Sequence, residues 1–117
     1  MTELEKFKLQ LRKFAEERDW EQFHSPKNLS MALSVEVAEI VEHFQWLTEE
    51  QSKNLPKDKL EKIEAELADT LIYLTRLADK LDIDLLTAAQ SKIEVNKRKY
   101  PVDKAKGNAK KYTELDK

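Results

Sequence analysis

Apolar residues recur along most of the chain at steps of three and four, which is the spacing of one face of an α-helix. The first such run comprises Leu4, Phe7, Leu11 and Phe14. Thr2 and Glu5 have the spacing of a capping box, in which each side chain accepts a hydrogen bond from the other residue's backbone. We therefore expect a first helix that begins at Thr2 and ends near "RDWEQFH", residues 18–24.

A second helical run follows Ser25 and Pro26, residue types that are favoured at the cap and in the first turn of a helix. Its apolar positions form a stripe that we expect to face the core: Leu29, Leu33, Val37, Ile40, Phe44 and Leu47. The polar stretch "TEEQSKNLPKD", residues 48–58, is expected to be a connecting loop.

A third helix is expected to begin near Asp58, and apolar residues cover a large part of its circumference. Ile72 and Leu77 widen the main apolar face on both flanks, which predicts burial against more than one neighbour. The main face carries Leu60, Ile63, Leu67, Leu71, Leu74, Ala78 and Leu81. A fourth helix is expected over residues 85–99, with Asp82 or Asp84 as its cap.

The composition favours an all-α fold, because the chain has one glycine and three prolines and so lacks the turn residues of a hairpin-rich protein. We expect a four-helix bundle-like protomer. We expect a single domain over residues 1–101. A polar, basic tail over residues 102–117 would follow it and dock on the domain through Tyr112 and Leu115. Pro101 would stop the fourth helix.

Charge and cysteine usage exclude several classes of function. The 21 Lys and Arg nearly balance the 23 Asp and Glu, so no general attraction to a nucleic acid polymer or an anionic membrane is expected. Cysteine is absent, which excludes disulfides, thiolate zinc sites and thiol nucleophiles. No apolar run approaches the roughly 18 residues of a membrane span, and the first residues lack a signal-peptide core, so we expect a cytoplasmic protein.

Two pairs of acids stand in apolar surroundings. Glu36 lies about 20° around its helix from Leu29, and Glu39 lies just beyond it on the same side. On the third helix, Glu66 and Asp69 form a stripe with Tyr73. Buried carboxylates need partners or a cation to stay charged. The pairs could face each other across an antiparallel helix pair and hold Mg²⁺ or Mn²⁺, ions suited to phosphate esters and anhydrides.

Other interpretations of these acids remain open. In a chain with 23 acids, a Glu-x-x-Glu pair on a helix is commonly solvated surface. A di-iron bundle would need a Glu-x-x-His pair on each of two helices, and the sequence does not provide both.

Four segments together resemble the MazG-like, all-α nucleoside triphosphate pyrophosphohydrolases, in particular their dCTP pyrophosphatase branch. They are "RDWEQFH", "EVAEIVEHFQW", "EAELADTLIYL" and "SKIEVNKRKYP", and the resemblance spans about residues 12–115. It implies Mg²⁺-dependent hydrolysis between the α and β phosphates of a nucleoside triphosphate, to a monophosphate and pyrophosphate. The residues that match the family's metal ligands are Glu36, Glu39, Glu66 and Asp69.

The resemblance also implies substrate-binding residues. Lys92, Asn96 and Tyr100 match positions that meet the nucleotide, although by themselves they are also an ordinary polar helix face. The candidates to enclose the base are Trp20, His24, Trp46 and Tyr73. Without the resemblance, the tryptophans would be core or interface residues, and His24 a capping partner. His43, one turn beyond Glu39, would orient a metal ligand or be exposed. Leu11 stands where the dCTP-preferring branch has a histidine, so the resemblance does not imply a strict preference for cytosine.

Self-association is expected as well, because helices this short leave the second face of the third helix uncovered in a monomer. A homodimer or a dimer of dimers, as in the family, would cover it. The rival interpretation is a non-catalytic helical oligomerisation or interaction module, which would depend on neither ions nor nucleotides.

Overall fold

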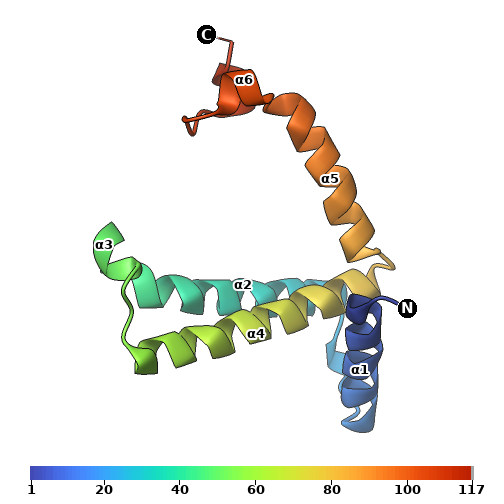
Figure 1. Ribbon diagram of the computed structural model, residues 1–117. Coiled ribbons are helices and arrows are strands. Elements are labelled where there is room, and N and C mark those ends of the chain that lie inside the picture. Colours follow the sequence, from blue (N-terminus) through green and yellow to red (C-terminus); the bar gives the residue numbers. More distant parts are fainter. Residues whose placement is uncertain (117) are drawn as a thin grey trace. The chain divides into compact units, whose positions relative to one another are not determined.

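The computed structural model describes residues 1–116, and none of them lies in a strand, which confirms the all-α prediction (Figure 1). The chain divides into two compact units, Met1–Ile83 and a second that begins at Asp84. No helix among these residues has both the length and the apolar character needed to cross a membrane.

The first unit holds the two longest helices. Its elements are α1 (Glu3–Glu17), the 3₁₀ turn η1 (Glu21–Phe23), α2 (Pro26–Phe44), α3 (Glu49–Ser52) and α4 (Lys57–Lys80). Helices α2 and α4 lie side by side and antiparallel, and α1 packs against α4 (Figure 1). The antiparallel pair is therefore the scaffold of this unit.

The helix starts follow the predicted caps. The Thr2 hydroxyl accepts a hydrogen bond from the Glu5 N–H, and the Glu5 carboxylate accepts one from the Thr2 N–H at 2.8 Å. Ser25 caps α2 with Pro26 in the first turn. The expected loop over residues 48–58 was wrong in one part, because α3 lies within it. Thr48 and a glutamine three positions on form a second capping box, which stabilises this short turn.

Helices α1 and α4 both end in a Schellman motif that contains aspartate where glycine is usual. Asp19 has φ 56° and Asp82 has φ 55°, both in the left-handed region. After α1, the Trp20 N–H donates to the Ala15 carbonyl at 2.9 Å, and the Asp19 N–H donates to the carbonyl of residue 16 at 3.1 Å. Each motif turns the chain sharply away from its helix.

The predicted apolar face of α4 is buried only in part. Ile63 and Ala78 of that face are buried, whereas its leucines are largely exposed, with Leu67 at 55%. Helix α2 packs instead against the side of α4 that carries Glu66 and Tyr73, both half-buried. On α2, Val37 is exposed although it belongs to the predicted core stripe.

The second unit contains α5 (Leu85–Lys99), α6 (Val102–Ala105) and the 3₁₀ turn η2 (Tyr112–Glu114). Asp84 caps α5, as predicted, by accepting a hydrogen bond from the Thr87 N–H at 3.0 Å. The predicted tail has more structure than its weak periodicity indicated, since it contains α6 and η2. The Tyr112 ring packs edge-on against Tyr100 with centroids 6.1 Å apart. Lys117 lies outside the described residues.

An ion pair joins α1 to α4. The Arg12 guanidinium donates to both carboxylate oxygens of Asp79, from Nε at 2.8 Å and from Nη2 at 2.6 Å. The Asp79 side chain is almost wholly buried, and Arg76 approaches it at 3.5 Å. The hydrogen bond from Arg12 is the main reason why the pKa of Asp79 lies below its usual value.

We expect Asp79→Asn to lower the free energy of unfolding by about 2 kcal/mol, the scale of hydrogen bonds to a charged group. Because the folded-state pKa of Asp79 is lowered, its contribution is complete above the unfolded pKa and is lost as pH falls through the folded pKa. Urea titrations at pH 7 and pH 3 measure both effects. Glu3→Gln, in an exposed pair with Lys6, is the matched control and should change stability by less than about 0.5 kcal/mol. Equal losses for the two variants would contradict the prediction.

Candidate metal centre and adjoining pocket

Three of the four predicted acids meet between α2 and α4. Glu36 and Glu39 lie one helical turn apart on α2, and Glu66 comes from the antiparallel α4. One carboxylate oxygen from each residue lies within 4.8 Å of the other two, and all three side chains are half-buried. The helix pair thus places three acidic oxygens in one small volume.

Two carboxylate oxygens of these acids are buried without a hydrogen-bond partner among the described residues, 1–116. They are Oε2 of Glu36 and Oε2 of Glu66. Burial, followed by the nearby Glu39 and Asp69 carboxylates, raises the pKa of Glu36. Burial and the adjacent Glu39 carboxylate raise the pKa of Glu66, and His43 opposes this rise. A cluster of this kind needs a proton or a cation.

The donor set fits a hard divalent cation. All three donors are carboxylate oxygens, the ligand type that Mg²⁺, Ca²⁺ and Mn²⁺ prefer. The two partnerless oxygens of Glu36 and Glu66 are the atoms that a cation would satisfy. The fourth predicted acid, Asp69, is not part of this close group, but its charge contributes to the raised pKa of both glutamates.

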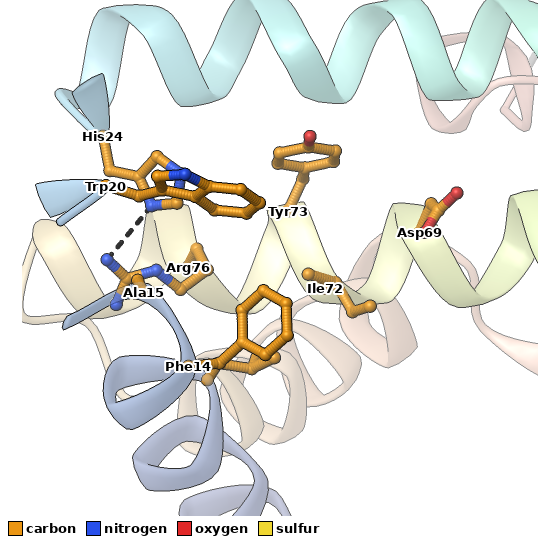
Figure 2. Close-up of a pocket in the computed structure, with 9 residues that line it drawn as sticks. Phe14, Ala15, Trp20, His24, Asp69, Ile72, Tyr73 and Arg76 are labelled. Carbon is orange, nitrogen blue, oxygen red and sulfur yellow. Dashed lines mark hydrogen bonds between the residues drawn. The ribbon is translucent and has the colours of Figure 1, made fainter. Parts of the chain in front are cut away.

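A cavity of about 240 Å³ lies among α1, the residues around η1 and α4 (Figure 2). Its wall is mainly aromatic and aliphatic. Trp20 packs edge-on against Phe14 with ring centroids 5.6 Å apart, and the His24 ring lies 6.1 Å from that of Trp20. The lining residues are Leu11, Phe14, Ala15, Trp20, His24, Asp69, Ile72, Tyr73 and Arg76.

The pocket brings together most of the predicted base-enclosing residues. Trp20, His24 and Tyr73 line it, and Asp69 lies on the same wall (Figure 2). Leu11 also lines it, so the position that differs from the dCTP-preferring branch belongs to the pocket. Trp46 does not line this pocket and is 87% exposed at the end of α2.

Besides Leu11, four lining residues were not among the predicted site residues: Phe14, Ala15, Ile72 and Arg76. The helical spacing of Phe14 predicts only a core position in the first helix. Tyr73 lies four residues after Asp69, and Arg76 lies three residues after Tyr73, so all three share one face of the helix. This spacing could have identified Arg76 as a candidate.

Arg76 is unusual among these residues because a charged side chain is only 3% exposed. Its Nη2 atom donates to Oε1 of Glu21 at 2.7 Å and approaches Nδ1 of His24 at 3.3 Å. Lys80 also pairs with Glu21, and the hydrogen bond from Lys80 is the main reason why the pKa of Glu21 is lowered. The end of the pocket is thus built on a network of ion pairs.

The predicted nucleotide contacts Lys92, Asn96 and Tyr100 belong to the second unit. Lys92 and Asn96 lie on α5, and Tyr100 follows its last residue. Their relation to the acids of the first unit stays a prediction.

The chain is similar to known proteins along most of its length. Residues 31–115 match the model of the MazG-like family. The chain is 47% identical over 104 residues to mouse dCTP pyrophosphatase 1 and 46% identical over 105 residues to the human protein of that name; each match covers 87% of this chain. The chain spans 61% of the length of these relatives.

A solved structure is similar over most of its length. The crystal structure of a pyrophosphatase from Archaeoglobus fulgidus matches with a TM-score of 0.81 and 38% identity, covering 86% of this chain and 94% of that one. Sequence and fold therefore agree, and the resemblance inferred from the motifs is confirmed: the chain belongs to the MazG-like family.

Proposed function

We propose that the protein hydrolyses nucleoside triphosphates, with dCTP-like substrates preferred, to a nucleoside monophosphate and pyrophosphate in the cytoplasmic nucleotide pool. The observation that carries this proposal is the pair of buried, partnerless carboxylate oxygens of Glu36 and Glu66 beside a pocket with an aromatic and aliphatic wall. The names of the mouse and human relatives support dCTP as the first substrate to test.

In this proposal Glu36, Glu39 and Glu66 hold Mg²⁺, or Mn²⁺ in its place, and Asp69 completes the ligand set. A bound ion would neutralise triphosphate charge and stabilise the leaving pyrophosphate. Asp69 is suited to this role because it lines the pocket and its charge acts on both Glu36 and Glu66. A base in the pocket would therefore bring its phosphates toward the acids.

The pocket wall suits a flat aromatic ligand. Trp20 and Tyr73 offer ring surfaces for stacking, which tolerates any base. Leu11 offers no hydrogen bond, so we expect graded rather than strict discrimination between cytosine, 5-substituted cytosine and other bases. Lys92, Asn96 and Tyr100 remain the proposed contacts to the nucleotide from the second unit.

Self-association through α4 would complete the site. The exposed leucines recur along one face at helical spacing, so a second copy related by a two-fold axis offers the same stripe over the same length. They are Leu60, Leu67, Leu71, Leu74 and Leu81. A homodimer or dimer of dimers would cover them, and the exposed Trp46 would be available to a neighbouring pocket.

The same leucine stripe would serve a non-catalytic helical interaction module, the alternative function. That alternative leaves Glu36 and Glu66 without a reason to be buried together. A hydrolase should turn over nucleotides and depend on divalent ions, whereas an interaction module should do neither.

Glu39→Gln and Asp69→Asn should each lower kcat by at least about 100-fold. Mutating a residue that only hydrogen-bonds a metal ligand already lowers metal affinity or activity by about 10- to 100-fold, and loss of a ligand itself should cost at least as much. Chromatography of the products of dCTP and other triphosphates, with and without Mg²⁺, measures monophosphate and pyrophosphate. Glu42→Gln, an exposed acid on the same helix, is the matched control and should retain activity. Release of orthophosphate, or full activity without divalent ions, would contradict the proposal.

Added Mg²⁺ should raise the melting temperature, and more at pH 8 than at pH 5. The pKa of Glu36 and of Glu66 is raised in the folded state, so without metal stability falls as pH rises from the unfolded to the folded pKa. Cation binding removes that penalty where the acids are ionised. Glu66→Gln should raise the metal-free melting temperature and remove most of the Mg²⁺ response.

Thermal melts with MgCl₂ and with NaCl at matched ionic strength distinguish binding from screening. Glu64→Gln, an exposed acid on α4, is the control and should respond as the parent protein does. An equal response to both salts would count against a bound ion.

The double variant Leu67→Lys, Leu71→Lys should sediment as a monomer, since it places like charges where two stripes would meet. Analytical ultracentrifugation over a concentration series measures the change, and circular dichroism shows whether the helices remain. A parent protein that is already monomeric at tens of micromolar would overturn the proposed association.

A further inference from the structure

The proposed hydrolysis assigns no role to Arg76, although this residue lies in the pocket wall and is almost wholly buried. Its guanidinium contacts Glu21 of η1, His24 just after η1, and Asp79 one turn further along α4. Burying a charge among so many partners fixes its position closely. The contact with His24 is the one that reaches the pocket (Figure 2).

The chemistry of this contact determines the proton on His24. A guanidinium has only donors, and Nη2 carries two hydrogens. One hydrogen accounts for the bond to Oε1 of Glu21 at 2.7 Å, and the other for the approach to Nδ1 of His24 at 3.3 Å. Nδ1 must then be an acceptor, so the imidazole is neutral and its hydrogen is on Nε2.

The surroundings of His24 keep the ring uncharged. Burial, and then the positive charge of Arg76, lower the pKa of His24. Lys80 acts in the same direction, and Glu21 acts against it. Glu21, which pairs with both Arg76 and Lys80, favours the charged imidazole, but burial and the charge of Arg76 outweigh its effect, so the pKa of His24 is lowered.

The remaining polar atom of the His24 ring is therefore a donor. We propose that Arg76 is a positioning residue that holds the hydrogen of His24 on Nε2, so that the pocket presents a hydrogen-bond donor to the base of the nucleotide. This inference rests on the proposed function, because it concerns how the same pocket selects its substrate. The matching group is a ring carbonyl oxygen or an unprotonated ring nitrogen.

A donor in this wall has few other partners. Leu11, Phe14, Ala15 and Ile72 offer no side-chain acceptor, and the polar groups of Trp20 and Arg76 are donors only. Asp69 and Tyr73 are the remaining polar residues of the lining. A base without an acceptor near His24 would leave the Nε2 hydrogen buried and unpaired, which disfavours binding. Arg76 would thus act on base selection without touching the base.

Nitrogen NMR of protein labelled at histidine tests the assignment directly, and His43 is the internal control because the chain has two histidines. At neutral pH we expect His24 to show a protonated Nε2 and an unprotonated Nδ1. In Arg76→Met the opposite tautomer should become detectable, and His24 should titrate at higher pH because a positive charge is gone. In Arg76→Lys, the tautomer ratio and the pKa of His24 should lie between those of the parent protein and those of Arg76→Met. Circular dichroism verifies that the variants are folded.

Kinetics test the consequence for the substrate. His24→Leu should raise KM for the best triphosphate about tenfold, the effect of one uncharged hydrogen bond, with a smaller change in kcat. His24→Gln, whose amide N–H can replace Nε2–H, should recover most of this loss. The Mg²⁺ concentration for half-maximal rate should be unchanged in both variants, which separates this role from that of the acids.

Several results would overturn the inference. A proton on Nδ1 of His24 in the parent protein, or on both nitrogens at neutral pH, would exclude the donor assignment. Unchanged His24 signals in folded Arg76→Met would exclude the role of Arg76, and an unchanged KM in His24→Leu would exclude contact with the base. A parent protein that hydrolyses no triphosphate but shows the expected tautomer would overturn the proposed activity and leave the assignment of the proton intact.

Discussion

Three carboxylates that repel one another lie between two antiparallel helices, and this repulsion limits how the two helices can pack. Helices α2 and α4 pack closely although their shared seam contains Glu36, Glu39 and Glu66. The leucine stripe of α4, by contrast, is largely exposed. Enclosing acids in this seam lowers stability unless a proton or a cation neutralises them.

The network of ion pairs around Arg76 has a different role, because it joins three separate pieces of chain. Arg12 from α1 meets Asp79, and Glu21 from η1 meets Arg76, so α1 and η1 are both anchored to α4. The pocket lies among these same elements. Its shape therefore follows from electrostatic contacts made mostly outside the pocket, and the acids that surround Arg76 keep its charge from remaining unpaired.

The sequence predicted those features that arise from short-range rules. Thr2, Ser25 and Asp84 were identified as caps because their side chains bond to backbone within three residues. The side of α4 that is buried was not predictable, since leucine spacing identifies an apolar face but not the element that covers it. The burial of Arg76 escaped notice for the same reason, because its partner Glu21 is far away in the sequence. The family was recognised from the order of its motifs, and the three glutamates that meet were among those expected.

The left-handed turn at Asp19 carries a further consequence. Glycine would adopt this conformation without strain, and aspartate tolerates it at an energetic penalty of about 1 kcal/mol. The same turn directs Trp20, the next residue, back over the end of α1 and onto the pocket. A side chain at Asp19 also narrows the backbone angles open to the unfolded chain, which offsets part of this strain. The placement of one aromatic ring of the pocket therefore depends on a single strained residue outside the pocket.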